Sequence, residues 1–270
     1  MTLIGVSALS GKNNMNEEYA VRLVDVFNNG ILDTDLEYLE ASKLVAAKKL
    51  MMIFEVIDFD KIRTVCDIGS RFMEQTMEMS FIFPEATLYA FEPVPESYAT
   101  CCNNKELLPA ENKARVNVFN YAVGDTQKMI PFYPVDNTGS EHNVGASSKY
   151  KFVEGLNGSF FGKTWNQTEI QVQQVSLDQW RKENNIAPVD MIWMDTQGGE
   201  LDVLKGATET LKDVKVIFTE VGIGTYYEGQ SLKPEIDAYM ASMGFEELDG
   251  AFVQNHQFEG DTIYVNTKFL

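Results

Sequence analysis

The sequence contains little cysteine and no long apolar run. Its three cysteines are Cys66, Cys101 and Cys102, and because the last two are adjacent they cannot form an ordinary disulfide framework. No stretch approaches the roughly 20 apolar residues of a membrane span. The N-terminus also lacks the charged start and sustained apolar stretch of a signal peptide. We therefore expect a soluble, unprocessed protein of a reducing compartment, the cytoplasm.

Basic residues and histidines are also few. The chain has 22 Lys and Arg against 40 Asp and Glu, a formal net charge of -18. A field of this sign repels phosphate backbones and anionic membrane surfaces, so we expect neither nucleic acid nor membranes as partners. Two histidines and unclustered cysteines offer no soft-metal site. Asp195 and Glu220 with a third oxygen donor can bind a hard divalent ion, but we expect no metal.

The chain is long enough for one large α/β domain with an appendage. We predict a helical N-terminal extension over residues 1–60. Apolar residues recur at helical spacing from Ala20 to Phe27, and a second helix begins at the capping box of Thr34 and Glu37. The apolar stripes of these helices are expected to pack on the main domain or on a second subunit, so a homodimer stays open.

Over residues 61–270, short apolar runs alternate with helical segments, which is typical of βαβ units and a parallel sheet. We predict a doubly wound, mostly parallel, seven-stranded α/β sheet of Rossmann-like type that ends in an antiparallel C-terminal pair. The predicted strands are Val65–Ile68, Leu88–Phe91, Val116–Ala122, Met191–Met194, Val214–Val221, Gly244–Leu248 and Thr262–Val265. Helices are predicted near 71–82, 95–107, 201–211 and 232–242. Residues 136–168, rich in Gly, Ser and Asn, are predicted to form a substrate lid.

In open α/β sheets, ligands bind beyond the C-terminal ends of the strands. The first predicted strand leads into Asp67, Gly69 and Ser70, where the glycine allows a tight turn and the next helix offers free backbone N–H groups for a carboxylate. The second strand leads into Glu92 and Pro93, where a carboxylate is placed to accept hydrogen bonds from two ribose hydroxyls. An adenosine with a charged tail fits both positions, because its ribose can bind Glu92 and its tail can bind at the turn after the first strand.

A nucleotide-dependent oxidoreductase is the weaker alternative. Its fingerprint requires G-x-G-x-x-G after the first strand, and this chain has only Gly69 there. Asp67 would also lie badly beside a pyrophosphate, whereas it favours a ligand that carries an ammonium and a sulfonium charge.

Successive blocks of the sequence resemble, in the same order, those of the FkbM-type methyltransferases. The blocks are Asp67–Gly69, Ala90–Pro93, Asn120–Asp125, Gly145–Ser148, Ser176–Asp178, Met194–Gly198, Glu200–Ala207, Tyr227–Gln230 and Gly260–Asp261. The resemblance spans about residues 60 to 267, and DTQG followed by ELDVLKGA is its most specific segment.

The resemblance implies a class I methyltransferase that uses S-adenosylmethionine, usually to methylate a hydroxyl of a sugar or a small metabolite. Carried over by position, the cofactor-binding residues are Asp67, Gly69, Ser70, Glu92, Pro93, Tyr121, Ala122, Asp195 and Gln197. The first three would hold the methionine end and Glu92 the ribose. Tyr121 and Ala122 would lie beside the adenine, and Asp195 and Gln197 would face the methyl group and the acceptor.

One position departs from the family pattern. Where the family usually has a second glycine, four positions after the first, this chain has Met73. Met73 shares a helical stripe with Met77 and Phe81, which predicts a core-facing side chain. A bulky residue near the cofactor's tail nevertheless leaves a non-catalytic binding module with the same fold as an alternative function.

Methylation of an alcohol needs a base, and three residues are candidates. Asp195 and Glu220 end adjacent predicted strands, and His142 lies in the predicted lid. For Asp195 the alternative is a plain N-cap of the next helix, and for His142 an exposed loop residue. We expect Asp195 to act in the transfer step.

Overall fold

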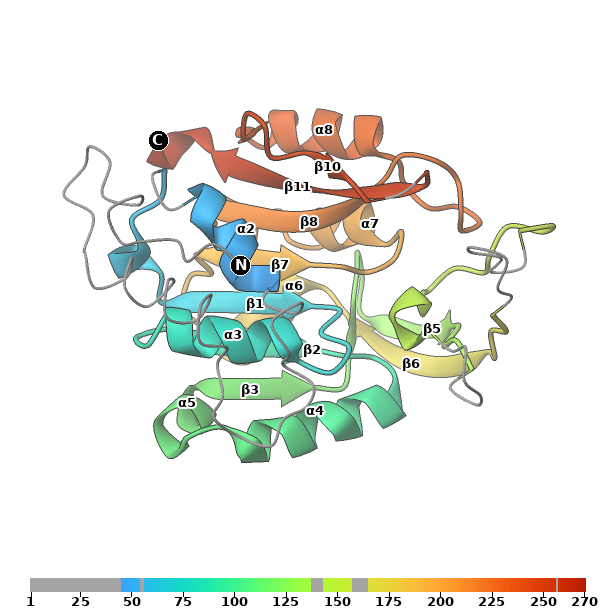
Figure 1. The fold of residues 1–270 in the computed structure, drawn as a ribbon, viewed down its shortest axis with the longest axis horizontal. Helices are drawn as coiled ribbons and strands as arrows, with labels where there is room; N and C mark the ends of the chain where they lie inside the picture. Colours follow the sequence, from blue (N-terminus) through green and yellow to red (C-terminus); the bar gives the residue numbers. More distant parts are fainter. Residues whose placement is uncertain (1–44, 54–55, 137–142, 157–164, 256) are drawn as a thin grey trace, which may run out of the picture.

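The main sheet has its strands in the order β10-β11-β8-β7-β1-β2-β3, with β9 paired to β11. The computed structural model describes residues 45–53, 56–136, 143–156, 165–255 and 257–270, and Figure 1 shows their arrangement. Five neighbouring strands are parallel: β1 (Thr64–Ile68), β2 (Thr87–Phe91), β3 (Val116–Phe119), β7 (Met191–Met194) and β8 (Val216–Gly222). The last strand, β11 (Glu259–Asn266), runs antiparallel to β8, β9 (Phe245–Glu247) and β10 (Val253–Gln254).

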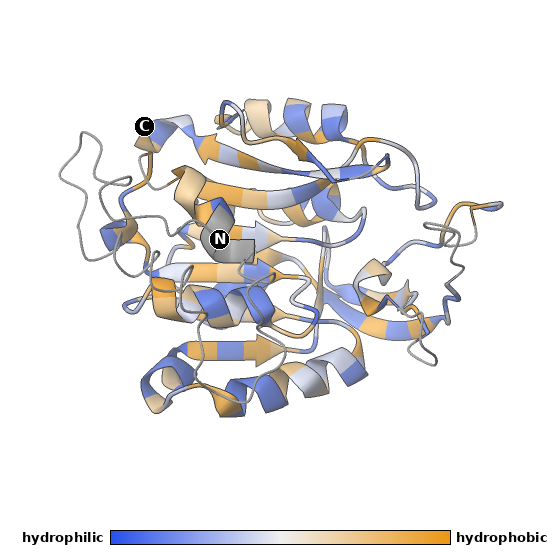
Figure 2. Cartoon of the chain, in the orientation of Figure 1, coloured by the Kyte–Doolittle hydropathy of each residue, from blue (hydrophilic) through white to orange (hydrophobic). Residues whose placement is uncertain are grey.

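Helices cover both faces of this sheet. They are α2 (Val45–Ile53), α3 (Glu74–Ile82), α4 (Pro95–Leu107), α5 (Ala110–Arg115), α6 (Leu177–Glu183), α7 (Glu200–Lys205) and α8 (Lys233–Ser242). In Figure 1, α2 and α3 lie in front of the sheet and α6 behind it. Strands β1, β7 and β8 are buried along their whole length and are mostly orange in Figure 2, as strands covered on both faces must be.

The alternation of side chains along β7 divides the core into two clusters. Met191 and Trp193 belong to the cluster that contains Leu50 of α2, whereas Ile192 and Met194 belong to the cluster that contains Trp180 of α6. This is the two-residue period of a strand whose faces are both packed. The predicted α/β fold, with its antiparallel C-terminal strands, is confirmed.

The sequence prediction differs from the structure in the number of strands and at several boundaries. The main sheet has eight strands rather than the predicted seven, because the two-residue strand β10 has no sequence pattern of its own. The third strand ends at Phe119 rather than Ala122, because the chain leaves the main sheet and Ala122–Val123 forms β4 in a second sheet. The helix predicted over 201–211 ends at Lys205, and a short 3-10 turn follows at Thr210–Lys212. At Gly206 the backbone approaches another segment so closely that a Cβ would lie 1.9 Å from the carbonyl oxygen of Gly124.

The second sheet was not predicted. It has the order β4-β6-β5, with β5 (Lys128–Phe132) antiparallel and β4 parallel to β6 (Ile170–Val175). Figure 1 shows it beyond the C-terminal ends of the parallel strands. The described parts of the predicted lid are joined to it by bridges between Tyr133 and Ser148 and between Val135 and Gln167.

Only the last part of the predicted extension falls within the described residues. The first predicted helix lies outside them, and α2 is the described end of the second. Leu50, Ile53 and Ile57 are buried in the same core cluster as Val65 of β1. The sequence left open whether these helices pack on the main domain or on a second subunit. Helix α2 packs on the main domain. The boundary at residue 60 stays a prediction. In the described part of the chain, no helix has the length and apolarity to span a membrane.

Candidate active site

A cavity of about 280 Å³ opens at the C-terminal ends of the parallel strands. The predicted site residues that line it are Gly69, Glu92, Pro93, Tyr121, Ala122, Asp195 and Gln197. They come from the ends of β1, β2 and β7, from the segment between β3 and β4, and from the first residue of β4. The topology brings them together because parallel strands end at one edge of the sheet.

The turn after β1 has an unusual backbone. Gly69, Arg71 and Met73 all have positive φ angles, 86°, 52° and 71°. The glycine is sterically required, because a Cβ at Gly69 would lie 1.9 Å from the carbonyl oxygen of Asp195. Non-glycine residues in this region of backbone space are strained, and such strain gathers at functional sites.

The backbone N–H groups of residues 69–72 are already bonded within the protein, and the predicted free donors at the start of the next helix stay a prediction. Those of Gly69 and Ser70 both donate to the carbonyl oxygen of Phe91 at 3.0 Å. The N–H of Arg71 donates to Glu92 at 2.9 Å, and that of Phe72 lies 3.2 Å from Glu74. A ligand carboxylate therefore finds no unbonded backbone donor among residues 69–72.

Asp67 and Ser70 do not line the cavity. The carboxylate of Asp67 accepts a 2.5 Å hydrogen bond from the Thr76 hydroxyl on α3, and burial raises the pKa of Asp67 to about 7. The Ser70 hydroxyl lies 3.1 Å from the carbonyl oxygen of Asp67 and is fully buried. Both side chains therefore stabilise the turn from the protein interior rather than contacting the cavity.

Glu92 faces the cavity and holds two loops together. Its two carboxylate oxygens accept hydrogen bonds of 2.9 Å from the backbone N–H groups of Val94 and Arg71. Burial raises the pKa of Glu92 to about 8, although both N–H groups oppose this shift. Each oxygen keeps a second lone pair, so the carboxylate can accept further hydrogen bonds from a ligand.

Met73 points away from the cavity. It is the residue before α3, and its side chain is fully buried in the core cluster that also contains Met77. It is not among the residues that line the cavity. The position where the family usually has glycine is therefore filled by a core side chain on a strained backbone.

Gln197 is the centre of a polar network at the other wall of the cavity. Its amide nitrogen donates to Asp195 at 2.8 Å and to Glu220 at 2.7 Å. Its amide oxygen lies 2.7 Å from the hydroxyl of Tyr227, which is buried in the loop after β8. Gln197 also has a positive φ of 54°. All hydrogen-bonding atoms of this side chain are engaged, which fixes its orientation.

Carboxylates crowd this wall. Asp195 is exposed to the cavity, but protein atoms surround it closely. Desolvation raises the pKa of Asp195 to about 6, and the negative charges of Glu259 and Asp261 contribute to this shift. The hydrogen bond from Gln197 has the opposite effect and lowers the pKa. The pKa of Glu220 is raised well above its usual value. Burial is the largest cause, and the negative charge of Asp195 is the next. Glu220 hydrogen-bonds Glu259, which requires a proton on one of the two carboxyls.

The turn that carries Asp195 and Gln197 is held by Glu200. One carboxylate oxygen of Glu200 accepts from the backbone and hydroxyl of Thr196, at 3.0 and 2.9 Å, and from the N–H of Gly198 at 3.2 Å. Burial raises the pKa of Glu200 to about 7. Helix α7 starts at Glu200 with Gly199 as its N-cap, so the alternative of Asp195 as an N-cap is wrong.

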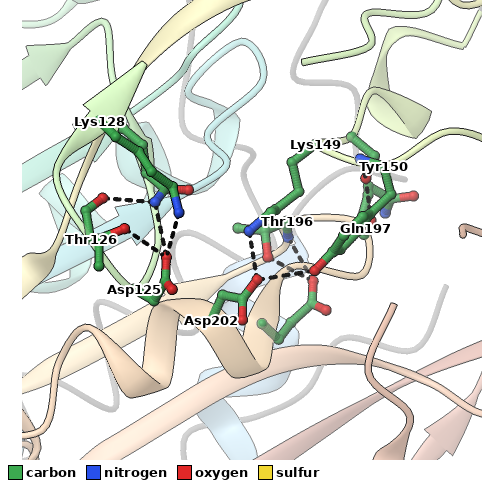
Figure 3. Close-up of polar contacts among 11 residues, drawn as sticks. Asp125, Thr126, Lys128, Lys149, Tyr150, Thr196, Gln197 and Asp202 are labelled. Carbon is green, nitrogen blue, oxygen red and sulfur yellow. Dashed lines mark hydrogen bonds and ion pairs between the residues drawn. The ribbon is translucent and has the colours of Figure 1, made fainter. Parts of the chain in front are cut away.

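Two cations line the cavity that the sequence analysis did not single out. Arg71 pairs with Glu74 at 2.7 Å. Lys149 pairs with Asp202 on α7 at 2.5 Å, and the Tyr150 hydroxyl lies 3.0 Å from the same carboxylate oxygen (Figure 3). Neither residue had a sequence signal, because both lie in irregular segments that only the fold brings to the cavity.

The remaining candidates contribute less to the site. His142 lies outside the described residues, so its role as a base stays a prediction. Glu220 contacts Gln197 without lining the cavity. Within the described residues, no group of three or more His, Cys, Asp or Glu side chains has an arrangement that could hold a metal ion.

A parallel sheet flanked by helices, with an antiparallel last strand and a cavity between a glycine turn and a strand-end carboxylate, is the architecture of a class I methyltransferase. The sequence profile of the methyltransferase FkbM domain matches residues 67–247. The chain belongs to this FkbM family and is an S-adenosylmethionine-dependent methyltransferase.

The chain is similar to several individual methyltransferases. The 2-O-methyltransferase NoeI of Sinorhizobium fredii is 30% identical over 206 residues, which cover 76% of this chain and 79% of the relative. The hexuronic acid methyltransferase AglP of Haloferax volcanii is 23% identical, over 52% of this chain and 49% of the relative. A crystal structure of methyltransferase FkbM from Methylobacillus flagellatus superposes with a TM-score of 0.48 at 10% identity, over 82% of this chain and 54% of that one.

Proposed function

We propose that this enzyme transfers the methyl group of S-adenosylmethionine to a hydroxyl of a sugar or a small metabolite, with Asp195 as the base. The observation that carries the proposal is the position of Asp195. Its carboxylate lines the same cavity as Glu92 and the glycine turn, on the side of the Gln197 network. The names of two relatives, a 2-O-methyltransferase and a hexuronic acid methyltransferase, support a hydroxyl acceptor of sugar type.

The residues around the glycine turn fit the cofactor. Glu92 has free lone pairs toward the cavity for the ribose hydroxyls. Tyr121, whose ring stacks on Phe119 with centroids 6.1 Å apart, and Ala122 would contact the adenine. Because the backbone donors of the turn are occupied, we assign the cofactor's carboxylate to the guanidinium of Arg71, which suits planar carboxylate recognition.

S-adenosylmethionine supplies an electrophilic methyl group, and the protein's own residues must orient the acceptor and take its proton. Holding the reacting groups in line lowers the barrier by several kcal/mol. Asp195, with a pKa of about 6, is mostly ionised at neutral pH and remains basic enough to accept a proton. The amide of Gln197 donates a hydrogen bond to one oxygen of the Asp195 carboxylate, and this bond fixes the orientation of the carboxylate.

The acceptor would bind on the wall that carries Ser147 and Lys149. These residues line the cavity from the segment joined to the second sheet. Lys149 has three N–H donors, of which its contact with Asp202 uses one. The other two can donate to hydroxyl oxygens of a sugar.

Binding measurements test the proposal. Calorimetric titration with S-adenosylmethionine, S-adenosylhomocysteine and NAD should give binding of the first two only. A non-catalytic module predicts no affinity for any of the three, and an oxidoreductase predicts affinity for NAD. Sugars and small hydroxylated metabolites are then screened for release of S-adenosylhomocysteine. Binding of S-adenosylmethionine without any acceptor-dependent release would leave the fold assignment intact but remove the proposed acceptor class.

A further inference from the structure

A salt bridge connects the N-terminal helix to the carboxylates of the active site. Lys49 of α2 lies 3.0 Å from Asp261 of β11, and both side chains are 18% exposed. Asp261 is the direct cross-strand partner of Glu220 on β8. Glu220 accepts from the Gln197 amide, and the same amide nitrogen donates to Asp195. A row of neighbouring polar groups thus runs from Lys49 on α2 to Asp195, the proposed base.

A second contact joins the same lysine to the cavity wall. The ammonium group of Lys49 lies 5.2 Å from the ring centroid of Phe218 on β8. Phe218 stacks on Trp193 with centroids 3.8 Å apart, and Trp193 lines the cavity. Figure 1 shows α2 crossing in front of β8 and β7, the strands that carry these rings. Both routes begin at Lys49 and end at the site.

We propose that Lys49 is a positioning residue for methyl transfer: through Asp261 it offsets the negative charge on β8 and β11 and so keeps Asp195 ionised as the base. This inference rests on the proposed role of Asp195. Lys49 lies outside the family match at 67–247 and before the resemblance that starts near residue 60, whereas Asp261 belongs to the last of the blocks that resemble the family. The lysine is therefore a feature that the N-terminal segment adds to the common domain.

The electrostatic environment of Asp195 supports the proposal. The titratable and charged groups that act on it come from the first strand and its turn, α7, β8, the loop after β8, and β11: Asp67, Arg71, Glu200, Glu220, Tyr227, Glu259 and Asp261. Most are acids, and Asp261 is one of the groups that raise the pKa of Asp195. Arg71 lowers the pKa of Asp195, but it is also paired with Glu74. Neutralising Asp261 from α2 therefore favours the ionised base.

The test uses the full chain and the substitution Lys49→Met, which keeps much of the side-chain length and removes the charge. Loss of one nearby positive charge should move the titration midpoint of Asp195 upward by roughly half to one pH unit. Methyl transfer should then fall roughly twofold to fivefold at pH 6 and change little at pH 8.5, because the base is protonated over a wider range. Lys49→Arg should behave as the wild type.

Two further variants separate this role from a structural one. Lys61→Met removes the same charge from an ion pair with Asp58 in which the lysine side chain is 71% exposed, and it should leave the profile unchanged. The double variant Lys49→Met/Asp261→Asn should restore the profile, because the uncompensated carboxylate is gone. A lower melting temperature in Lys49→Met with an unchanged pH profile would overturn the proposal.

A readout without turnover keeps the test independent of the acceptor. The carboxyl carbon of Asp195 is identified in a ¹³C NMR spectrum as the signal absent from Asp195→Asn. Its midpoint should rise in Lys49→Met, and an unchanged midpoint refutes the link between α2 and the site. If the midpoint rises while Asp195→Asn keeps full activity, the electrostatic link stands and the proposed base is wrong.

Discussion

The carbonyl oxygen of Asp195 occupies the place where a side chain on Gly69 would begin. A Cβ at Gly69 would lie 1.9 Å from that oxygen. The N–H of Asp195 in turn donates to the carbonyl of Ile68 at 2.9 Å, so the two strand ends are locked together. The residue proposed to hold the cofactor and the residue proposed to act as the base therefore share one rigid backbone contact.

Gly69→Ala should accordingly disrupt the site. The added methyl group meets backbone rather than a flexible side chain, and the φ of 86° disfavours any L-residue. We expect a loss of stability of about 3 kcal/mol or more, or a loss of S-adenosylhomocysteine binding. Gly244→Ala is the matched control, because its φ is 83° but nothing lies within 4 Å of the added Cβ. Equal melting temperatures for the two variants would contradict the close packing.

Asp195→Asn should lower turnover while cofactor affinity stays nearly unchanged. The amide preserves the shape but cannot accept the acceptor's proton. Loss of a general base typically costs about a hundredfold to ten-thousandfold in rate. Turnover is measured with the acceptor found by screening, and affinity by calorimetry. Wild-type turnover would exclude Asp195 as the base, whereas a parallel loss of affinity would make it a cofactor ligand.

Folding stability should fall as the pH rises from about 5 to 8. The pKa values of Asp67, Glu92 and Glu200 in the folded protein are raised to about 7, 8 and 7, so the folded state binds more protons than the unfolded state in this range. By linkage, the stability is greatest at the acidic side of this window and is lost toward its alkaline side. Thermal unfolding at pH 5.5, 7 and 8 measures the slope.

Glu200→Gln should flatten this slope. The amide oxygen can accept the three hydrogen bonds that Glu200 accepts, but the side chain no longer titrates. We expect the difference in unfolding free energy between pH 5 and 8 to shrink by roughly 1–3 kcal/mol. Glu209→Gln, at a carboxylate with 70% of its side chain exposed, serves as the control. A slope that is the same in wild type, Glu200→Gln and Glu209→Gln would show that Glu200 does not titrate with the fold.

Met73→Ala should destabilise the fold, because the side chain is fully buried. Truncation of a core methionine costs about 2–5 kcal/mol. Met73→Gly loses the same packing but relieves the strain of a φ of 71°, which costs about 1 kcal/mol or more in a residue with a Cβ. The glycine variant should therefore be at least as stable as the alanine variant, which reverses the usual order. Chemical denaturation of both decides the matter.

Removal of residues 1–57 should lower thermal stability and solubility. Leu50, Ile53 and Ile57 are each at most 2% exposed, and their loss uncovers the core beside β1. Burial of each such side chain contributes about 1.5–3 kcal/mol. Removal of residues 1–44 keeps α2 and is the comparison that isolates its contribution. Two truncations of equal stability would show that α2 does not support the domain.

The sequence predicted the parts of the fold that depend on local pattern. Strands such as Met191–Met194 were placed correctly because a continuous apolar run suits a strand covered on both faces. The second sheet was missed because Lys128–Phe132 alternates exposed and buried residues over only part of its length, and β4 has two residues. Strands this short are defined by their partners rather than by their own composition.

The residues of the candidate site, likewise, could be predicted only where local sequence pattern determines their position. Gly69, Glu92 and Asp195 follow strands directly, so the position of each strand predicted their place at one edge. Arg71, Lys149 and Tyr227 reach the cavity wall or its network only through turns and long-range contacts. The bonded state of the N–H groups after β1 depends on Phe91 and Glu92, and no pattern within the turn itself indicates those partners.

The pairing of β4 with β6 makes the proposed acceptor wall one continuous insertion in the chain. The chain departs at Val123 and returns at Val175, which are register partners in two parallel strands. Ser147 and Lys149 lie in the segment between these two adjacent points, while Glu92 and the glycine turn stay on the main sheet. A foreign segment grafted at these points should exchange one acceptor for another, provided that it keeps the contacts that Ser148 and Lys149 make with Gln197 and Asp202.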